Sequence, residues 1–289
     1  MADPRLKQKL LRGEFIVAPG VFDMMSAMLA ERVGFDAVYA SGFWLTASYL
    51  GIPDAGIATY TDMLNRVAKV VEKSSAPVIA DADTGFGGLL NVHHTVRGYE
   101  HAGVSAIQIE DQEFPKKCGH TPYRRVIPIE DMVAKIRVAV DARKDPNFMV
   151  IARTDARTGH GLEEAVKRGE AFAAAGADIV FVESLQSEDE MRAACQRIRA
   201  PMMANMSDGG KSPIRSAREL QDFGYSLAIF PAMAALAACA AVEQAMRGLK
   251  VAGTSQGHVP LFSFDEFCRL VGFGDVWAFE EKWKDVLQK

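Results

Sequence analysis

The chain has 289 residues, of which 49% are hydrophobic and 24% are charged, so it can bury a large core and still present a polar surface. Its formal net charge of −4 and isoelectric point near 5.9 exclude the strongly basic surface that binds a nucleic-acid backbone or an anionic membrane. We therefore expect an ordinary globular protein without a nucleic-acid or membrane partner.

The amino-terminal segment up to Phe15 is polar and lacks the apolar core of a signal peptide. The alanine-rich stretch 231–246 is interrupted by Glu243 and is too weakly hydrophobic for a membrane span, so we expect a buried or intersubunit helix. The cysteines are scattered and lack the Cys-x-x-Cys spacing of a structural zinc site, and their pattern does not indicate a disulfide framework. We therefore expect reduced cysteines and a cytoplasmic location. The four cysteines are Cys118, Cys195, Cys239 and Cys268.

Short β-branched runs alternate with longer amphipathic stretches along the chain, which is typical of βα units in a parallel sheet. Eight strands are predicted at residues 15–19, 37–41, 77–83, 106–111, 148–154, 179–183, 202–205 and 227–231. The amphipathic stretches predict helices at residues 25–33, 61–73, 93–102, 130–142, 162–175, 188–199 and 216–223.

Eight regular units favour a closed (β/α)8 TIM barrel. A doubly wound open sheet is the alternative, but it normally carries a glycine-rich loop after its first strand, and Ala18-Pro19-Gly20 lacks that form. Glycines that follow the last apolar turn of several helices, such as Gly103 and Gly176, supply the expected caps. We predict one barrel domain over residues 1–289, with a helical extension at about 232–289.

Most predicted strands begin with apolar residues and finish in groups that bind or react. In a (β/α)8 barrel the carboxyl ends of the strands meet at one opening, where active sites are built. We expect that opening to hold Tyr39, Ser41, Asp81, Asp83, Glu110, Asp111, Arg153, Asp155, Glu183 and Asn205.

Two carboxylates at the end of the third strand indicate a metal site. Asp81 and Asp83 are two positions apart, so on a strand their side chains share one face. Carboxylate oxygens suit Mg²⁺, with Mn²⁺ as the alternative. Asp54 and Glu110 are candidates for the outer, water-bridged ligands.

The run Lys116-Lys117-Cys118-Gly119-His120 places one thiol among three potentially cationic side chains in a polar segment. Cysteines used for packing lie in apolar elements, whereas a thiol beside Lys and His has a lowered pKa and exchanges protons near neutrality. We therefore interpret Cys118 as a functional cysteine.

Three segments together resemble the isocitrate lyase and phosphoenolpyruvate mutase superfamily over nearly the whole chain. They are the cysteine run at 116–120, which is similar to the lyase branch, the Asp81 to Gly87 segment, and Ala152-Arg153-Thr154-Asp155-Ala156. The resemblance implies a Mg²⁺-dependent TIM barrel that forms a homotetramer, with the C-terminal helices exchanged between subunits.

The resemblance also implies roles for individual residues. Asp83 would bind the metal directly, and Asp54, Asp81 and Glu110 would hold its waters. Substrate carboxylates would be bound by Ser41, Gly42, Phe43, Arg153, Glu183, Asn205 and Ser207. The catalytic set would be Cys118, Tyr39, Arg153, Lys116 and His120, with Cys118 as general acid on a mobile lid at about 114–125. The lysines of the run should turn toward substrate carboxylates when this lid closes.

The reaction implied is the carbon–carbon cleavage of a 2-hydroxy di- or tricarboxylate to pyruvate or another 2-oxo acid and a carboxylate. Phe43 and Trp44 follow Ser41-Gly42, where the segment of related lyases is serine-glycine-glycine. Phe264 resembles the position of an arginine of methylisocitrate lyases. Without that guanidinium a third carboxylate loses its natural partner, so a 2,3-dialkylmalate is favoured and 2-methylisocitrate is second. Arg269 is an alternative partner for that carboxylate, and a surface role for Arg269 is equally expected. A phosphonomutase or carboxyphosphonoenolpyruvate-type enzyme, an oxaloacetate hydrolase or decarboxylase, and a non-catalytic metabolite-binding barrel are the alternatives.

Overall fold

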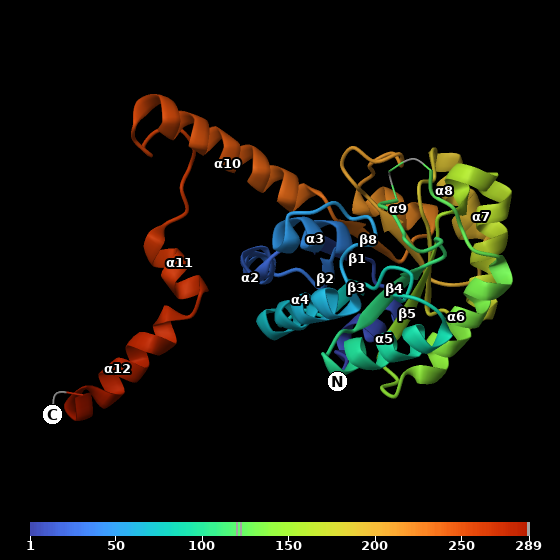
Figure 1. Ribbon diagram of the computed structural model, residues 1–289, viewed down its shortest axis with the longest axis horizontal. Coiled ribbons are helices and arrows are strands. Elements are labelled where there is room, and N and C mark those ends of the chain that lie inside the picture. The colour runs from blue at the N-terminus through green and yellow to red at the C-terminus, as the bar shows by residue number, and fades with distance from the viewer. Residues whose placement is uncertain (120, 122, 288–289) are drawn as a thin grey trace. The chain divides into compact units, whose positions relative to one another are not determined.

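The computed structural model describes residues 1–119, 121 and 123–287 (Figure 1). The chain divides into two compact units, Met1–Ala235 and Leu236–Lys289. Each unit is described separately below.

The first unit is a closed barrel of eight parallel strands in chain order, which confirms the predicted (β/α)8 fold. The barrel closes where β1 pairs with β8, with Ile16 opposite Leu227 and Pro19 opposite Phe230. The strands are β1 Ile16–Val21, β2 Val38–Ala40, β3 Val78–Asp81, β4 Ala106–Glu110, β5 Met149–Thr154, β6 Ile179–Val182, β7 Met202–Asn205 and β8 Leu227–Phe230.

Helices surround the strands, as Figure 1 shows. All seven predicted helices are present, with bounds that differ from the prediction by a few residues at most ends. They are α2 Met24–Val33, α4 Tyr60–Lys73, α5 Leu89–His101, α6 Ile129–Ala142, α7 Ala156–Ala174, α8 Glu188–Arg197 and α9 Ala217–Phe223. The largest difference is in α7, which begins six positions before the predicted residue 162 because its first turn precedes a break at Gly161, where φ is 86°.

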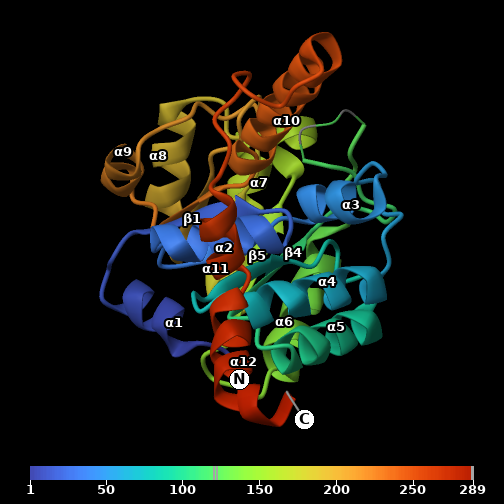
Figure 2. The same cartoon turned by 90° about the vertical axis from the view of Figure 1, so that its left-hand side faces the viewer.

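Two helices were not predicted, α1 Pro4–Leu11 and α3 Gly42–Leu50. Helix α1, near the amino terminus in Figure 2, has a single fully buried residue, Leu6, which packs with the residues inside the barrel. The segment was not predicted as a helix because it is mostly polar, and a single buried leucine, Leu6, is enough to hold it against the barrel. Helix α3 begins directly after β2 and so fixes the backbone at Ser41 and Gly42.

Strand alternation separates two hydrophobic cores. Residues such as Ile79, Ile151 and Phe181 fill the barrel interior, whereas Ile107 and Val150 belong to the larger cluster between the strands and the helices. A strand buried on both faces reads as a continuous apolar run, which is why the strands could be located in the sequence.

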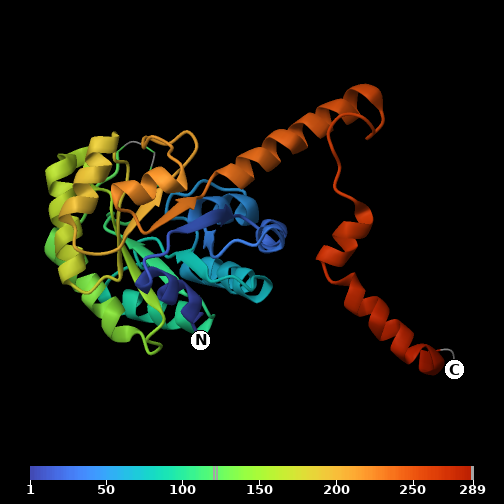
Figure 3. The same cartoon turned by 180° about the vertical axis from the view of Figure 1, so that it is seen from behind.

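The second unit contains most of α10 (Met233–Ala252), together with α11 (Phe264–Leu270) and α12 (Phe273–Leu287), the orange to red segments of Figure 3. The segment after α10 returns to it: Gln244 Nε2 donates to the His258 carbonyl at 3.0 Å, and the His258 ring lies against Gly248. The single-domain prediction and the exchange of these helices between subunits stay predictions. None of the described helices combines the length and hydropathy required to cross a bilayer.

Candidate active site

Polar side chains gather where the strands end at one opening of the barrel. Asp81 is the last residue of β3, Glu110 is the last of β4, and Arg153 is the penultimate residue of β5. Glu183 directly follows β6, and Asn205 ends β7. Because the strands of a closed parallel barrel all end on the same side, these five residues share one rim.

A buried lysine binds two of the acids that were predicted to hold a metal. Lys116 Nζ lies 2.7 Å from Asp54 Oδ1 and 2.7 Å from Asp83 Oδ1. Burial alone would lower the pKa of Lys116, but Asp83 and the other nearby carboxylates hold it well above its usual value, so the side chain is an ammonium. In this structure Lys116 is bound to Asp54 and Asp83, and the turn of the lysines toward substrate carboxylates stays a prediction.

The acids around Lys116 carry more negative charge than this one ammonium neutralises. The pKa of Asp83 is raised to about 7, mainly by burial and also by the charges of Asp81 and Asp54, against the lowering by Lys116. Burial also raises the pKa of Glu110 well above its usual value. Among the described residues Glu110 Oε1 has no hydrogen-bond partner. Buried carboxylate oxygens with excess charge and an open acceptor fit Mg²⁺ or Mn²⁺.

The ligands are not preassembled for such a cation. Within residues 1–119, 121 and 123–287, no three Asp, Glu, His or Cys side chains form a group that could hold a metal ion. Lys116 Nζ bonds to both Asp54 and Asp83 and supplies the positive charge there. A divalent cation at these acids would therefore replace or share the contacts of the ammonium.

Asp83 reaches this cluster through a turn and not along a strand. The prediction that Asp81 and Asp83 share a strand face was wrong, because β3 ends at Asp81 and Asp83 has a φ of 48°. This left-handed backbone is uncommon outside glycine, although Asp adopts it more readily than most residues. The two residues are linked instead by a hydrogen bond of 3.0 Å from the Asp83 N–H to Asp81 Oδ1.

Arg153 is surrounded by carboxylates. Its Nε and Nη2 donate to the two oxygens of Asp155, each at 2.9 Å. Glu110 Oε2 lies 3.3 Å from Nε, and Glu183 Oε2 lies 3.5 Å from Nη2. Although burial opposes the charge, these acids hold the pKa of Arg153 well above its usual value. The result is a fixed, charged guanidinium, the group best suited to bind a planar carboxylate.

The structure brings Glu183 and Asn205 together beside Arg153. Asn205 Nδ2 donates to Glu183 Oε2 at 3.0 Å. Asn205 Oδ1 is buried and has no hydrogen-bond partner among the described residues, so it is an open acceptor next to Glu183. Ser207 lies on the loop that follows β7, where its carbonyl accepts the Gly210 N–H at 2.9 Å.

Tyr39 lies inside the barrel below the rim. It is 3% exposed, and its hydroxyl donates to Gln108 Oε1 at 3.2 Å. Burial, with a further contribution from Asp81, raises the pKa of Tyr39 well above its usual value. The side chain is therefore a neutral phenol that can donate or accept one hydrogen bond.

The turn from β2 into α3 positions Ser41, Gly42 and Phe43. The Gly42 N–H donates to Asp81 Oδ2 at 3.3 Å, and a Cβ at this position would lie only 2.6 Å from the same oxygen. Ser41 is buried at the N-cap of α3, and Phe43 packs edge-on against Trp44 with ring centroids 4.8 Å apart. The role of Ser41 and Gly42 in carboxylate binding stays a prediction, with the Gly42 N–H bound to Asp81 in this structure.

The loop 112–126, here called the lid, has a hydrogen-bonded base. Gln112 and Val126 form an antiparallel bridge. The Gln112 side chain also bonds to both backbone groups of Lys117, at 2.9 and 3.0 Å. The Lys117 side chain points outward and is exposed. His120, predicted to be catalytic, lies outside the described residues.

The tip of the lid sits on the predicted site. The Cys118 N–H donates to the Asp54 carbonyl at 3.2 Å, so the thiol-bearing residue adjoins the acid cluster. A Cβ at Gly119 would lie 2.2 Å from Arg153 Nη2, and Ser184 Oγ contacts the Gly119 carbonyl at 3.4 Å. Only glycine allows the lid to approach Arg153 this closely. The sequence reasoning gave Gly119 no role, although its position next to Cys118 was the available signal.

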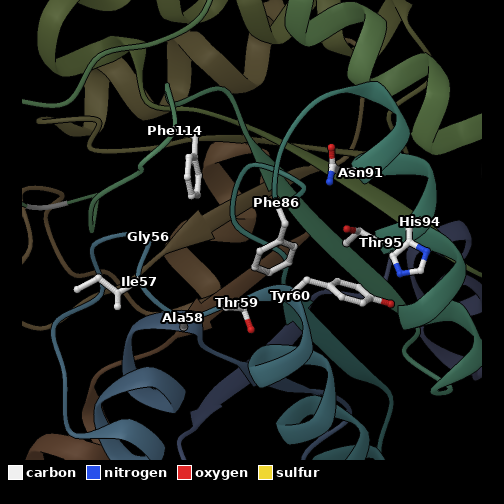
Figure 4. Close-up of a pocket in the computed structure, with 10 residues that line it drawn as sticks. All are labelled: Gly56, Ile57, Ala58, Thr59, Tyr60, Phe86, Asn91, His94, Thr95 and Phe114. Carbon is white, nitrogen blue, oxygen red and sulfur yellow. The ribbon is translucent and has the colours of Figure 1, made fainter.

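A cavity of about 430 Å³ opens among the loops at the same end of the barrel (Figure 4). Gly56, one of its lining residues, also packs against Pro115 and Lys116 of the lid. No lining residue belongs to the predicted catalytic, substrate-binding or metal set. The lining residues are Gly56, Ile57, Ala58, Thr59, Tyr60, Phe86, Asn91, His94, Thr95 and Phe114.

The reactivity of Cys195, a partly buried cysteine outside the candidate site, can be measured. It lies on α8, and burial raises the pKa of its thiol to about 12. At about pH 8 we expect iodoacetamide to modify Cys195 roughly 10³-fold more slowly in the folded protein than in concentrated urea, because only the thiolate reacts. Peptide mapping by mass spectrometry checks this; equal rates in both conditions would contradict the burial of this thiol.

Residues 6–250 match the family model described as phosphoenolpyruvate phosphomutase. The chain is 44% identical to 2,3-dimethylmalate lyase of Eubacterium barkeri, over 96% of this chain and 97% of the relative. It is 41% identical to 2-methylisocitrate lyase of Aeropyrum pernix, over 98% of this chain and 91% of the relative.

Two solved structures are also similar to this chain in sequence and in fold. Oxaloacetate acetylhydrolase in complex with the inhibitor 3,3-difluorooxalacetate has a TM-score of 0.91 at 32% identity and covers 96% of this chain and 95% of its own. Phosphonopyruvate hydrolase in complex with oxalate and Mg²⁺ has a TM-score of 0.87 at 33% identity and covers 98% of this chain and 99% of its own.

Proposed function

The chain belongs to the phosphoenolpyruvate mutase and isocitrate lyase superfamily of lyases and mutases, and from this premise we propose that it is a Mg²⁺-dependent carbon–carbon lyase. Its proposed substrate is a 2-hydroxy dicarboxylate of the 2,3-dialkylmalate type, which yields pyruvate and a short monocarboxylate. The observation that carries the proposal is the contact of the Cys118 lid with both the acid cluster and Arg153.

The acid cluster is the proposed cation site. Asp83 would bind Mg²⁺, or Mn²⁺, directly, while Asp54, Asp81 and Glu110 would hold its waters. When bound, the cation would stabilise the negative charge on the 2-oxygen of the substrate. Glu110 Oε1 supports this assignment because it has no hydrogen-bond partner among the described residues and so leaves an open acceptor. The raised pKa of Asp83 also supports it, because a carboxylate buried this deeply needs a nearby cation to stay ionised.

The protein's own residues would bind and orient the substrate. Arg153, fixed by Asp155, would bind the carboxylate that becomes part of the 2-oxo acid. Asn205 offers an open acceptor near Glu183, and with Ser207 these residues would surround the far carboxylate. Ser41, Gly42 and Phe43 would form the opposite wall, and Tyr39 would lie below the reacting hydroxyl.

Cys118 would act as the general acid. A base takes the 2-hydroxyl proton, and C2 with its oxygen becomes the ketone of the 2-oxo acid as the bond between C2 and C3 breaks. The electron pair of this bond passes to the departing monocarboxylate fragment, which is released as an enediolate. The Cys118 thiol gives its proton to the carbon of that fragment and becomes a thiolate. Lid closure excludes water that would compete for this step. Lys116 and His120 complete the proposed catalytic set.

The dialkylmalate preference is supported by the wall after β2 and by the relatives. Phe43 and Trp44 form an edge-on aromatic pair there, which suits an apolar substituent better than a third carboxylate. The 2,3-dimethylmalate lyase relative is 44% identical over nearly the full length of both chains. 2-Methylisocitrate is the second choice of substrate.

Two other activities remain as alternatives because similar proteins perform related reactions. The structural similarity to oxaloacetate acetylhydrolase favours an oxaloacetate-acting enzyme as the first alternative. The family model favours a phosphonomutase or carboxyphosphonoenolpyruvate-type enzyme as the second.

We also propose a homotetramer in which the helices of residues 236–289 pack against other subunits. The support is the exposure of large apolar residues there, including Phe264, Trp277 and Phe279, which are 78%, 47% and 61% exposed. Size-exclusion chromatography with light scattering measures the mass of the assembly; a monomer would overturn this part of the proposal.

A substrate panel tests the function. Pyruvate and glyoxylate release should be measured for 2,3-dimethylmalate, 2-methylisocitrate, isocitrate and oxaloacetate, with and without EDTA. We expect pyruvate from dimethylmalate and none after EDTA treatment. Glyoxylate from isocitrate would contradict the substrate preference, and no release from any acid would put the phosphonomutase first, to be tested with phosphonopyruvate by phosphorus NMR.

A further inference from the structure

Arg124 joins the carboxyl-terminal part of the lid to the barrel through hydrogen bonds to Asp155 and Thr158. Its Nη1 donates to Asp155 Oδ1, and its Nη2 donates to Thr158 Oγ1 at 2.7 Å. Its Nε donates to the Thr121 carbonyl within the lid at 3.2 Å. The side chain is only 3% exposed although it belongs to a surface loop. All three guanidinium nitrogens are therefore engaged, two of them outside the lid.

The acceptor of this contact, Asp155, also holds Arg153. Oδ1 of Asp155 accepts from both Arg124 and Arg153, while Oδ2 accepts from Arg153 Nε. The carboxyl group has no exposed side-chain surface. Burial alone would raise the pKa of Asp155, but the two guanidinium groups hold it below its usual value. One carboxylate thus joins the lid to the proposed substrate-binding arginine.

Asp155 is itself fixed to the barrel wall. Its backbone N–H donates to Asp111 Oδ1 at 2.9 Å. Asp111 Oδ2 accepts from Thr154 Oγ1 at 2.7 Å and from Arg168 Nη1 at 3.0 Å. Asp155 is therefore anchored by its own backbone, so the parts free to shift when the lid opens are the two guanidinium groups.

We propose that Arg124 and Asp155 are positioning residues that couple closure of the lid to the orientation of Arg153. With the lid closed, Arg124 and Arg153 share Asp155 Oδ1, and Gly119 lies against Arg153 Nη2. With the lid open, Arg153 would lose the Gly119 contact and would no longer share Asp155 Oδ1 with Arg124, so the lid would no longer help to set its orientation toward the substrate. The contact between Arg124 and Asp155 itself includes none of the acids around Lys116.

The lid offers a matched control in the adjacent Arg125. Arg125 is 79% exposed and pairs with Glu113 on the surface at 2.7 Å. Surface pairs of this kind contribute little to stability, whereas removing one partner of a buried pair leaves the other charge uncompensated. Arg124→Gln and Arg125→Gln remove the same charge from neighbouring positions of the same loop.

Hydrogen–deuterium exchange without substrate tests the closure of the lid. In Arg124→Gln we expect exchange of lid peptides to accelerate about tenfold or more, because the lid opens more often. Arg125→Gln should match the wild type, and Arg124→Lys, which keeps the charge, should fall between them. Peptides of β5 report in the same experiment whether the barrel is folded. Unchanged lid exchange in Arg124→Gln would overturn the proposal.

Kinetics with 2,3-dimethylmalate test whether lid closure is coupled to the orientation of Arg153. This part of the proposal rests on the proposed function. We expect Arg124→Gln to lower kcat/KM by about 10²-fold, with a rise in KM as well as a fall in kcat. A smaller folded fraction would lower kcat alone. Faster lid exchange with an unchanged KM would refute the coupling. If the wild type cleaves none of the acids, the proposed function falls, and the exchange comparison still decides whether Arg124 holds the lid.

Discussion

Replacement of Cys118 by serine is expected to lower turnover of 2,3-dimethylmalate by about 10³-fold, within the range by which general acids accelerate reactions. Serine has nearly the same shape as cysteine, but its hydroxyl is a far weaker acid than the thiol. The departing enediolate would then lack its proton donor. The lid itself should still close, because the hydrogen bond to the Asp54 carbonyl comes from the backbone N–H of residue 118.

Binding and chemistry can be separated in this variant. Isothermal titration with dimethylmalate should give a dissociation constant within about threefold of the wild type, since a group that acts only in the transition state contributes little to substrate binding. Cys239→Ser, at an exposed cysteine of α10, is the matched control and should retain full activity. Full turnover in Cys118→Ser would remove this thiol from the chemistry.

The barrel was predictable because its strands are short apolar runs between amphipathic helices. The strand at residues 202–205 was predicted at its observed bounds, and the other strands differ by one or two residues at their ends. Helix α1 was missed because only Leu6 of its residues is buried, so it gives almost no apolar periodicity. Local patterns therefore identify elements that bury a face, and they overlook elements anchored by one side chain.

The rim of the barrel was predictable in the same way, but its contacts were not. The fold alone places Asp81, Glu110 and Arg153 at one opening, since they lie at the carboxyl ends of neighbouring strands. The pairing of Lys116 with Asp54 joins residues 62 positions apart in sequence across two loops, and no local pattern specifies it. The left-handed backbone at Asp83 likewise depends on the turn that follows β3 and on the buried groups around it.

Replacement of Asp83 by asparagine is expected to remove the divalent-cation site. The affinity for Mn²⁺ should fall by more than about 10²-fold, because a ligating carboxylate matters at least as much as the groups that support it. Turnover should fall by about 10³-fold, since stabilisation of the charged oxygen by the cation is worth several kcal/mol. Electron paramagnetic resonance titration with Mn²⁺ measures the first effect, and pyruvate release measures the second.

Asp141→Asn is the matched control for this substitution. Asp141 is exposed in the last turn of α6, where an added negative charge is unfavourable, so its neutralisation should leave both cation binding and turnover unchanged. Wild-type affinity for Mn²⁺ in Asp83→Asn would show that Asp83 is not a ligand, whatever happens to turnover.

The pH dependence of stability distinguishes loss of a ligand from loss of the fold. In the folded protein burial raises the pKa of Asp83 from 3.8 to about 7, so metal-free wild type should lose stability as the pH rises through this interval and the buried acid ionises. Asparagine cannot ionise, so in EDTA the melting temperature of Asp83→Asn relative to wild type should increase between about pH 5 and pH 8. The opposite trend would mean that, in the metal-free protein, the attraction to Lys116 outweighs the cost of burying the charge of Asp83.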